Sequence, residues 1–129
     1  MTKKPILTLP IASTALDDDP EFVHPGGLAE LRIRFDRNGV IVRSGLRFTR
    51  VRAFRFRSEG HCTRWHVEGT YDTLVEVEQS DWVLELLAAE PSATSGHWNI
   101  RHFLIYIDGA GAYEVAAEDV DWLPEQAAL

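Results

Sequence analysis

The chain has 129 residues, of which 45% are hydrophobic and 26% are charged, and its formal net charge is −7. This composition excludes a disordered chain and predicts one globular domain spanning residues 1–129. No apolar run approaches the roughly 18 residues of a membrane helix, so no membrane segment is expected. The single cysteine, Cys62, excludes an intrachain disulfide and fits a reducing compartment. Prolines and polar residues interrupt the N-terminal apolar run, so a cytoplasmic location is expected.

Charge is divided unevenly along the chain. Residues 32–64 contain ten arginines and two acids, whereas residues 65–129 contain thirteen acids and one arginine. Such a division is typical of a binding surface, or of two halves that pair with each other.

The first half of the chain predicts strands separated by loops. Residues 1–27 are expected to be loosely structured, with one candidate edge strand over 6–11. Alternating apolar and polar residues predict a strand over 31–35, which an Asn-Gly turn joins to a second strand. The second strand begins at Val40 and continues to Phe48 after a break at Ser44-Gly45. The next strand, over 51–57, changes phase, which favours a bulge or a strand buried on both faces.

The second half predicts one helix and a central hairpin. A helix over 80–90 is expected, with Ser80 as its N-cap and Pro91 as its stop. The strand over 98–107 is apolar on both faces, as a central strand should be, and a glycine-rich turn returns it as 112–117.

The remaining segments complete the fold class. Residues 73–77 predict a further strand, residues 120–124 predict a last edge strand, and 124–129 is expected to be a short tail. Successive antiparallel strands with short turns predict a mainly β fold, an antiparallel β-sandwich or a partly open barrel with one short helix. An α+β arrangement, with the helix packed across a sheet, is the alternative.

Four arginines are candidate binding residues. Arg32 and Arg34 share one strand face, and Arg55 and Arg57 share another. If the two strands adjoin, the guanidinium groups form a patch suited to phosphate, which is one alternative function. The acidic net charge opposes nucleic-acid binding, and carboxylates on a later strand are available to pair with these arginines.

The segment 61–66 is the candidate metal or catalytic site. His61, Cys62 and His66 lie within six residues, and His97 or His102 would have to join them to complete a tetrahedral zinc site. No C-x-x-C or His-Glu-x-x-His motif is present. The competing interpretation is that these residues are an ordinary loop histidine and a small buried cysteine with no shared role. His102 itself is interpreted as a core histidine.

Three further features of the sequence bear on binding. Asp17-Asp18-Asp19 and Glu21 resemble a calcium-binding loop only in composition, because no EF-hand spacing exists. With no glycine-rich phosphate loop either, no cofactor is expected. Tryptophans are enriched where proteins meet, so three of them are candidate partner contacts, with plugging of the sandwich ends as the alternative. They are Trp65, Trp98 and Trp122.

From Phe54 onward the layout resembles small bacterial proteins of unknown function. The segments that carry the resemblance are 54–59, 75–82, 101–106 and 113–117. The likeness covers roughly the last 75 residues by this strand–helix–hairpin layout. It implies an immunity-type or accessory partner of a larger protein, and no functional residue is carried over from it.

Together these observations favour a non-enzymatic protein-interaction module. No catalytic motif is present, and the split charge suits a surface that recognises another protein or a second copy of the chain. A small ligand- or metal-binding protein or enzyme using 61–66, and nucleic-acid binding through 32–64, are the alternatives.

Overall fold

The computed structural model describes residues 1–91 and 99–128. Its strands are β1 (Thr2–Thr8), β2 (Glu21–Val23), β3 (Ala29–Arg37), β4 (Val40–Thr49), β5 (Ala53–Ser58), β6 (Thr73–Glu78), β7 (Arg101–Ile107), β8 (Gly111–Ala117) and β9 (Asp119–Ala127). Its helices are α1 (Arg64–Val67) and α2 (Asp81–Ala88), with 3-10 turns η1 (Ser13–Ala15) and η2 (Glu59–His61). No helix in the described ranges is long and apolar enough to cross a membrane.

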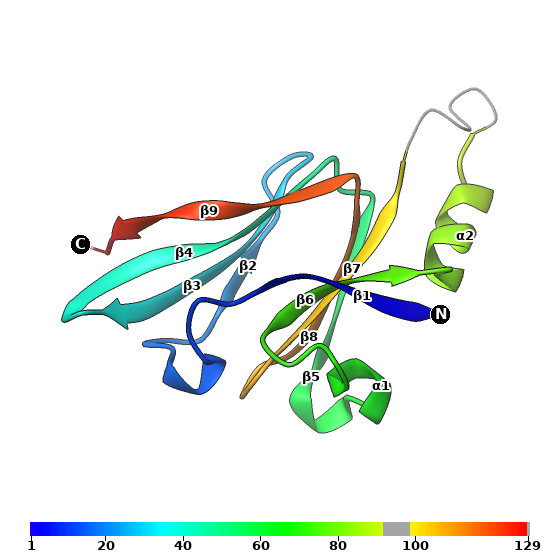
Figure 1. Ribbon diagram of the computed structural model, residues 1–129. Coiled ribbons are helices and arrows are strands. Elements are labelled where there is room, and N and C mark those ends of the chain that lie inside the picture. The colour runs from blue at the N-terminus through cyan, green and yellow to red at the C-terminus, as the bar shows by residue number, and fades with distance from the viewer. Residues whose placement is uncertain (92–98, 129) are drawn as a thin grey trace.

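The strands form two antiparallel sheets, so the predicted β-sandwich is confirmed. One sheet has the order β1-β6-β7-β8-β5 and the other has the order β2-β3-β4-β9. The two sheets face each other, and α1 and α2 lie beside the five-stranded sheet, on the side away from the four-stranded one (Figure 1). Each sheet has two edges, and the strands do not close into a barrel.

Strand β7 is the centre of the five-stranded sheet and is buried on both faces, as its sequence predicts. Phe103, Ile105 and Ile107 join the main core between the sheets. Leu104 and Tyr106 point the other way, into a second apolar cluster beneath α1. This second cluster positions the candidate site, because it seats α1 against the outer face of the sheet.

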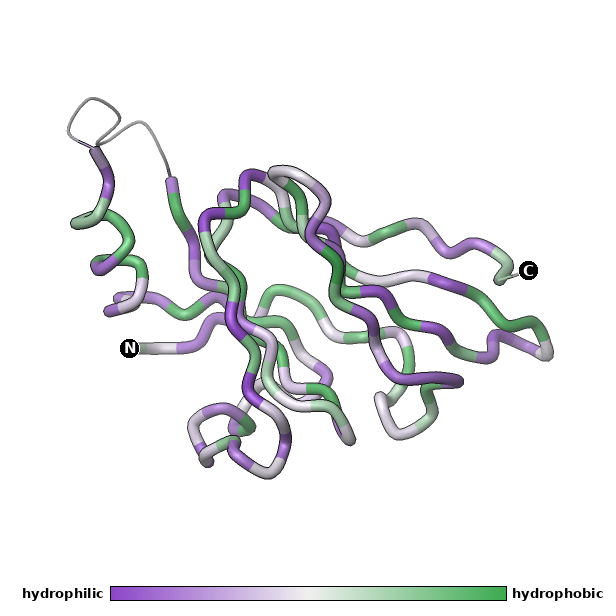
Figure 2. The backbone as a smooth tube through the Cα atoms, turned by 180° about the vertical axis from the view of Figure 1, so that it is seen from behind, coloured by the Kyte–Doolittle hydropathy of each residue, from purple (hydrophilic) through white to green (hydrophobic). Residues whose placement is uncertain are grey.

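The β3–β4 hairpin forms where the Asn-Gly signal predicts it. Asn38 and Gly39 both have positive φ, 55° and 88°, which is the backbone that a two-residue hairpin turn requires. Leu31, Ile33 and Phe35 are buried while the residues between them are exposed, and hydropathy alternates along the paired strands in Figure 2.

The phase change after residue 50 marks a crossing between sheets, not the bulge or doubly buried strand expected from the sequence. β4 ends at Thr49, Arg50 has φ 54°, and the chain then enters β5 in the other sheet. Val51 lies in the crossing between the two strands, so its place in the alternation is not continued by Phe54 and Phe56 of β5.

Both chain ends are more ordered than the sequence predicts. The segment 1–27, expected to be loosely structured, contains the strands β1 and β2 and the turn η1. β1 lies at a sheet edge, as expected, but it spans Thr2–Thr8 and not the predicted 6–11. The expected tail at 124–129 is part of β9 as far as Ala127. These segments gain order from pairing with distant strands, which local sequence does not record.

Helix α2 confirms the helix predicted over 80–90, with Ser80 as its N-cap and Asp81–Ala88 as its helical residues. The Ser80 side chain accepts a hydrogen bond from the Val83 N–H, and Asp81 lies in the first turn. The face with Trp82 and Leu86 is half-buried, and no residue of α2 is fully buried. The four-residue helix α1 was not predicted.

Candidate functional site

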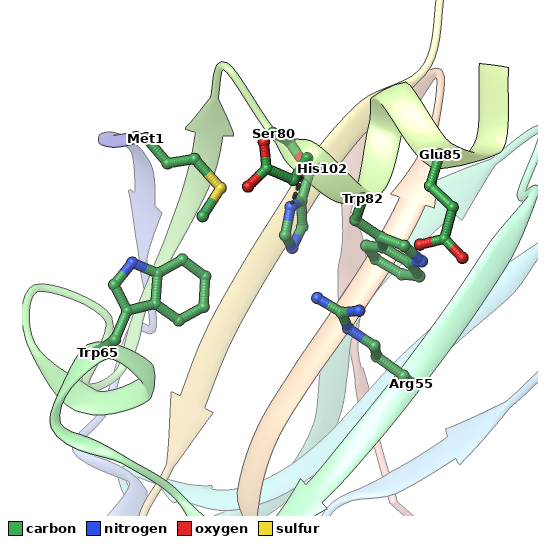
Figure 3. A pocket seen from close by; sticks show the side chains of 8 residues that line it. Met1, Arg55, Trp65, Ser80, Trp82, Glu85 and His102 are labelled. Atoms are coloured by element: carbon green, nitrogen blue, oxygen red, sulfur yellow. Dashed lines mark hydrogen bonds between the residues drawn. The ribbon is translucent and has the colours of Figure 1, made fainter. Parts of the chain in front are cut away.

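A cavity of about 310 Å³ opens on the outer face of the five-stranded sheet, below the start of α2 (Figure 3). Three elements supply its polar wall: Ser80 precedes α2, His102 projects from β7, and Arg55 projects from β5. Two tryptophans form the apolar walls, with Trp65 on α1 and Trp82 on α2. Residues far apart in sequence therefore meet at one small opening.

A continuous chain of hydrogen bonds runs through the floor of this site. Ser80 Oγ lies 2.8 Å from His102 Nδ1, and His102 Nε2 lies 2.7 Å from Glu114 Oε1. Arg55 binds the same carboxylate through Nε at 2.8 Å and a terminal nitrogen at 3.0 Å. Ser80, His102 and Glu114 are all buried, so this polar chain is satisfied internally.

The charge on Glu114 is fixed by its neighbours. Burial by itself would raise the pKa of this carboxyl group. The hydrogen bonds from His102 and Arg55, with the positive charge of Arg55, outweigh burial and lower the pKa to about 2. Glu114 is therefore a carboxylate at neutral pH and can only accept hydrogen bonds.

Cation–π contacts hold both tryptophan walls. The Arg55 guanidinium lies 4.1 Å from the Trp82 ring centroid, and Lys3 Nζ lies 4.7 Å from the Trp65 ring centroid. Lys3 also donates to the backbone carbonyls of Trp65 and Glu68, which ties α1 to β1. The cavity walls are thus built by side chains from both halves of the chain.

The described residues do not form the predicted metal site. Within the described residues, no group of three His, Cys, Asp or Glu side chains converges to hold a metal ion. Cys62 Sγ donates to the Arg57 carbonyl at 3.4 Å, and His66 Nδ1 accepts from the Thr63 N–H at 3.0 Å. His61 is exposed in η2. The polar atoms of Cys62 and His66 are thus used in contacts within the local turn.

The predicted arginine patch does not form either, because its strands do not adjoin. Arg32 and Arg34 lie on β3 of the four-stranded sheet, whereas Arg55 and Arg57 lie on β5 of the other sheet. At least seven of the ten arginines of 32–64 are in ion pairs with carboxylates of the described residues. Of the four predicted residues, only Arg55 belongs to the cavity.

The tryptophan predictions divide in the same way. Trp65 lines the cavity with Trp82, while Trp122 is 38% exposed on β9 of the other sheet. The two tryptophans that line this cavity, Trp65 and Trp82, are therefore not the predicted set. His97 and Trp98 lie outside the described residues.

A second surface lies at the open margin between the sheets, where β5 ends the five-stranded sheet. Phe54 and Phe56 are 45% and 52% exposed there. Phe22 of β2 lies 4.9 Å from Phe54, and Tyr113 of β8 lies 4.8 Å from Phe56, between ring centroids. These four rings, which we call the margin cluster, line a cavity of about 460 Å³.

The meeting of Ser80, His102 and Glu114 was missed from the sequence. Ser80 was expected to cap a helix and His102 to lie in the core, and both roles are observed. The available signal was Glu114 itself, a carboxylate within a strand whose two faces are apolar.

Comparison with protein-family models, curated sequences and solved structures gives no match to this chain.

Proposed function

We propose that this chain is a protein-interaction module that pairs the free edge of β5 with an extended strand of another protein. The observation that carries the proposal is the state of β5. It combines unpaired backbone groups with two exposed phenylalanines on one short strand. Strand addition at such an edge takes affinity from the backbone and specificity from the side chains.

The register identifies the free backbone groups. Arg55 is opposite Glu114 in the β5–β8 ladder, and the Glu59 N–H continues that ladder by donating to the Ala110 carbonyl. Antiparallel bonding alternates along a strand, so odd-numbered residues of β5 bond to β8. Phe54 and Phe56 therefore direct their N–H and C=O groups away from the sheet.

The other three sheet edges carry features that discourage pairing. β1 contains Pro5 and two lysines, β2 has only three residues, and β9 contains Pro124 and several acids. Proline, lysine and short length are the usual protections of exposed edges. β5 has neither proline nor lysine, which distinguishes it as the edge suited to a partner.

The side chains of β5 specify the chemistry of that partner strand. Phe54 and Phe56 favour apolar residues on one face of it. Arg57 is exposed and, within the described part of the chain, has no carboxylate partner, so an acidic residue fits the other face. A second copy fits less well, because a two-fold β5 pair sets arginine opposite arginine, which is destabilising.

The test compares matched variants of the full chain. Tagged protein is incubated with nuclease-treated native lysate, and the retained proteins are quantified at moderate salt. Wild type retains a stoichiometric protein, and Phe56→Asp or Arg57→Glu lowers its retention about tenfold or more. Leu84→Asp is the control, because Leu84 is 62% exposed on α2, away from β5.

Equal retention by all four proteins, or no stoichiometric protein with wild type, contradicts the proposal. Light scattering tests whether the partner is a second copy of this chain. If wild type is a dimer and Phe56→Asp is a monomer, the occupant of the β5 edge is a second copy and not another protein. An immunity-type or accessory role in the cytoplasm, as the resemblance and the single cysteine imply, is part of this proposal.

A further inference from the structure

The polar chain beneath α2 has a defined direction. Arg55 holds Glu114 as a carboxylate, so His102 Nε2 must donate its hydrogen across the 2.7 Å contact. A neutral imidazole with hydrogen on Nε2 has its lone pair on Nδ1. Ser80 Oγ lies 2.8 Å from His102 Nδ1, so the serine hydroxyl donates to that nitrogen. This is the arrangement in which a histidine removes a proton from a serine.

Ser80 also lies next to free backbone donors. It occupies the turn between β6 and α2, immediately after Gln79, which has φ 57°. Val83 donates its N–H to Ser80 Oγ at 3.2 Å. Among the described residues, the N–H groups of Asp81 and Trp82 have no acceptor, as expected at the start of a helix. Backbone N–H groups beside a nucleophile can stabilise an oxyanion.

The cavity gives this serine access to a small substrate. Ser80 and His102 both line the space of about 310 Å³, and Trp65, Trp82 and Met1 supply apolar walls (Figure 3). Charged side chains complete the lining: Arg55, Asp81 and Glu85. These walls suit a short apolar acyl group, and the opening beside Ser80 leaves room for its leaving alcohol. The lining therefore favours a carboxylic ester with a small acyl portion.

We propose that Ser80 is the nucleophile of an ester-hydrolysing site, with His102 as its general base and Glu114 as the residue that positions His102. Ser80 Oγ bonds to the ester carbonyl carbon while its proton passes to His102 Nδ1. The carbon–oxygen bond to the alcohol then breaks, and the departing oxygen takes that proton. Water attacks the acyl-serine, gives a proton through His102 back to Ser80 Oγ, and releases the acid.

This activity goes beyond the interaction role and departs from the non-enzymatic expectation. It uses the outer face of the five-stranded sheet, whereas partner pairing uses the edge of β5. Either assignment stands if the other fails. Sequence favoured no enzyme because Ser80, His102 and Glu114 share no motif and meet only through the fold.

The test is covalent labelling of the full chain with a fluorophosphonate probe, followed by peptide mass spectrometry. Wild type is expected to carry the probe on Ser80. Ser80→Asn keeps a good N-cap residue but removes the nucleophile, so labelling at this position is abolished. His102→Gln slows labelling about a hundredfold or more, because the general base is lost.

Ser44 provides the matched control. It is 5% exposed, as Ser80 is, but its hydroxyl donates to the Leu123 carbonyl and contacts no histidine. Ser44→Ala should be labelled at Ser80 at the wild-type rate. Absence of probe from Ser80 in folded wild type, or labelling unaffected by His102→Gln, overturns the proposal. The wild-type result decides even if a variant does not fold.

Discussion

At the scale of single residues, Glu114 is a buried carboxylate whose charge depends on its hydrogen-bond partners. Its carboxylate receives hydrogen bonds from both Arg55 and His102, and its pKa falls to about 2 from an ordinary 4.5. A depressed carboxyl pKa adds stability above the unfolded pKa, and that stability is lost as pH falls through the folded pKa. The window therefore lies between about pH 4.5 and pH 2.

We expect Glu114→Gln to remove this pH dependence. The stability difference from wild type should be largest near neutral pH and should shrink by on the order of 3 kcal/mol as pH falls through the window. Urea unfolding of both proteins across that range measures it. Glu125→Gln is the control, because its pair with Arg37 is partly exposed and contributes little. A constant difference between wild type and Glu114→Gln contradicts this account.

Gly45 is a second residue whose identity the fold dictates. Its φ is 145°, and a Cβ at this position would lie 2.0 Å from the Leu31 carbonyl oxygen. Gly45→Ala should therefore lower the free energy of unfolding by roughly 3 kcal/mol or more. Gly27→Ala is the control, because its Cβ would meet no atom within 4 Å and its φ is not positive. Equal unfolding midpoints for the two variants would refute the close approach.

What the sequence predicts at this scale follows from how local each role is. Ser80 was recognised as an N-cap because its capping partner is three residues away. Its bond to His102 and the bond from His102 to Glu114 join three separate elements, and no local pattern encodes such contacts. The 61–66 segment shows the converse case. Its potential metal ligands are adjacent in sequence, but Cys62 and His66 use their polar atoms in contacts within the local turn.

At the scale of elements, the sequence predicts a strand or helix correctly where the hydrophobic periodicity and the turn or cap residues indicate the same element. The β3–β4 and β7–β8 hairpins and helix α2 were found because alternation, helical spacing and caps mark them. Strands β1, β2 and the end of β9 are specified by pairing with distant partners, so their local sequences understate their order. Helix α1 is too short for periodicity to reveal.

Helix α2 is held in place by its N-cap and by one half-buried face. We therefore expect it to open locally while the sheets stay folded. Ser80→Ala removes the acceptor for the Val83 N–H, which should destabilise α2 by about 1 kcal/mol, and it also removes the hydroxyl that bonds His102 Nδ1. Amide hydrogen exchange should then accelerate several-fold in α2, and protection in the hairpin of β7 and β8 should remain. Ser80→Asn should retain wild-type exchange. Uniform acceleration throughout the chain would contradict this local role.

At the scale of the whole molecule, the division of charge serves mainly internal pairing. Arginines of 32–64 pair with acids of the C-terminal half, as in Arg37 with Glu125 and Arg55 with Glu114. Others pair with nearby acids, as Arg32 does with Glu30. The sequence reveals the asymmetry, but only the fold distributes the arginines over two sheets.

This pairing predicts an absence of strong nucleic-acid binding. The chain should show no retention of DNA or RNA in filter binding at about 50 mM salt, where phosphate contacts are strongest. Glu21→Gln with Glu30→Gln, which releases Arg32 of β3 and Arg47 of β4, serves as a positive comparison. Tight wild-type binding that weakens steeply with salt would restore the arginine hypothesis.

The central claim is that β5 is the edge at which a partner strand pairs. Hydrogen–deuterium exchange of the full chain, alone and with the captured partner, tests it most directly. We expect the partner to slow exchange of the amides of Phe54 and Phe56, whose N–H groups point away from β8 in the observed register. Protection confined to other strands or to α2, with exchange in β5 unchanged, would contradict the claim.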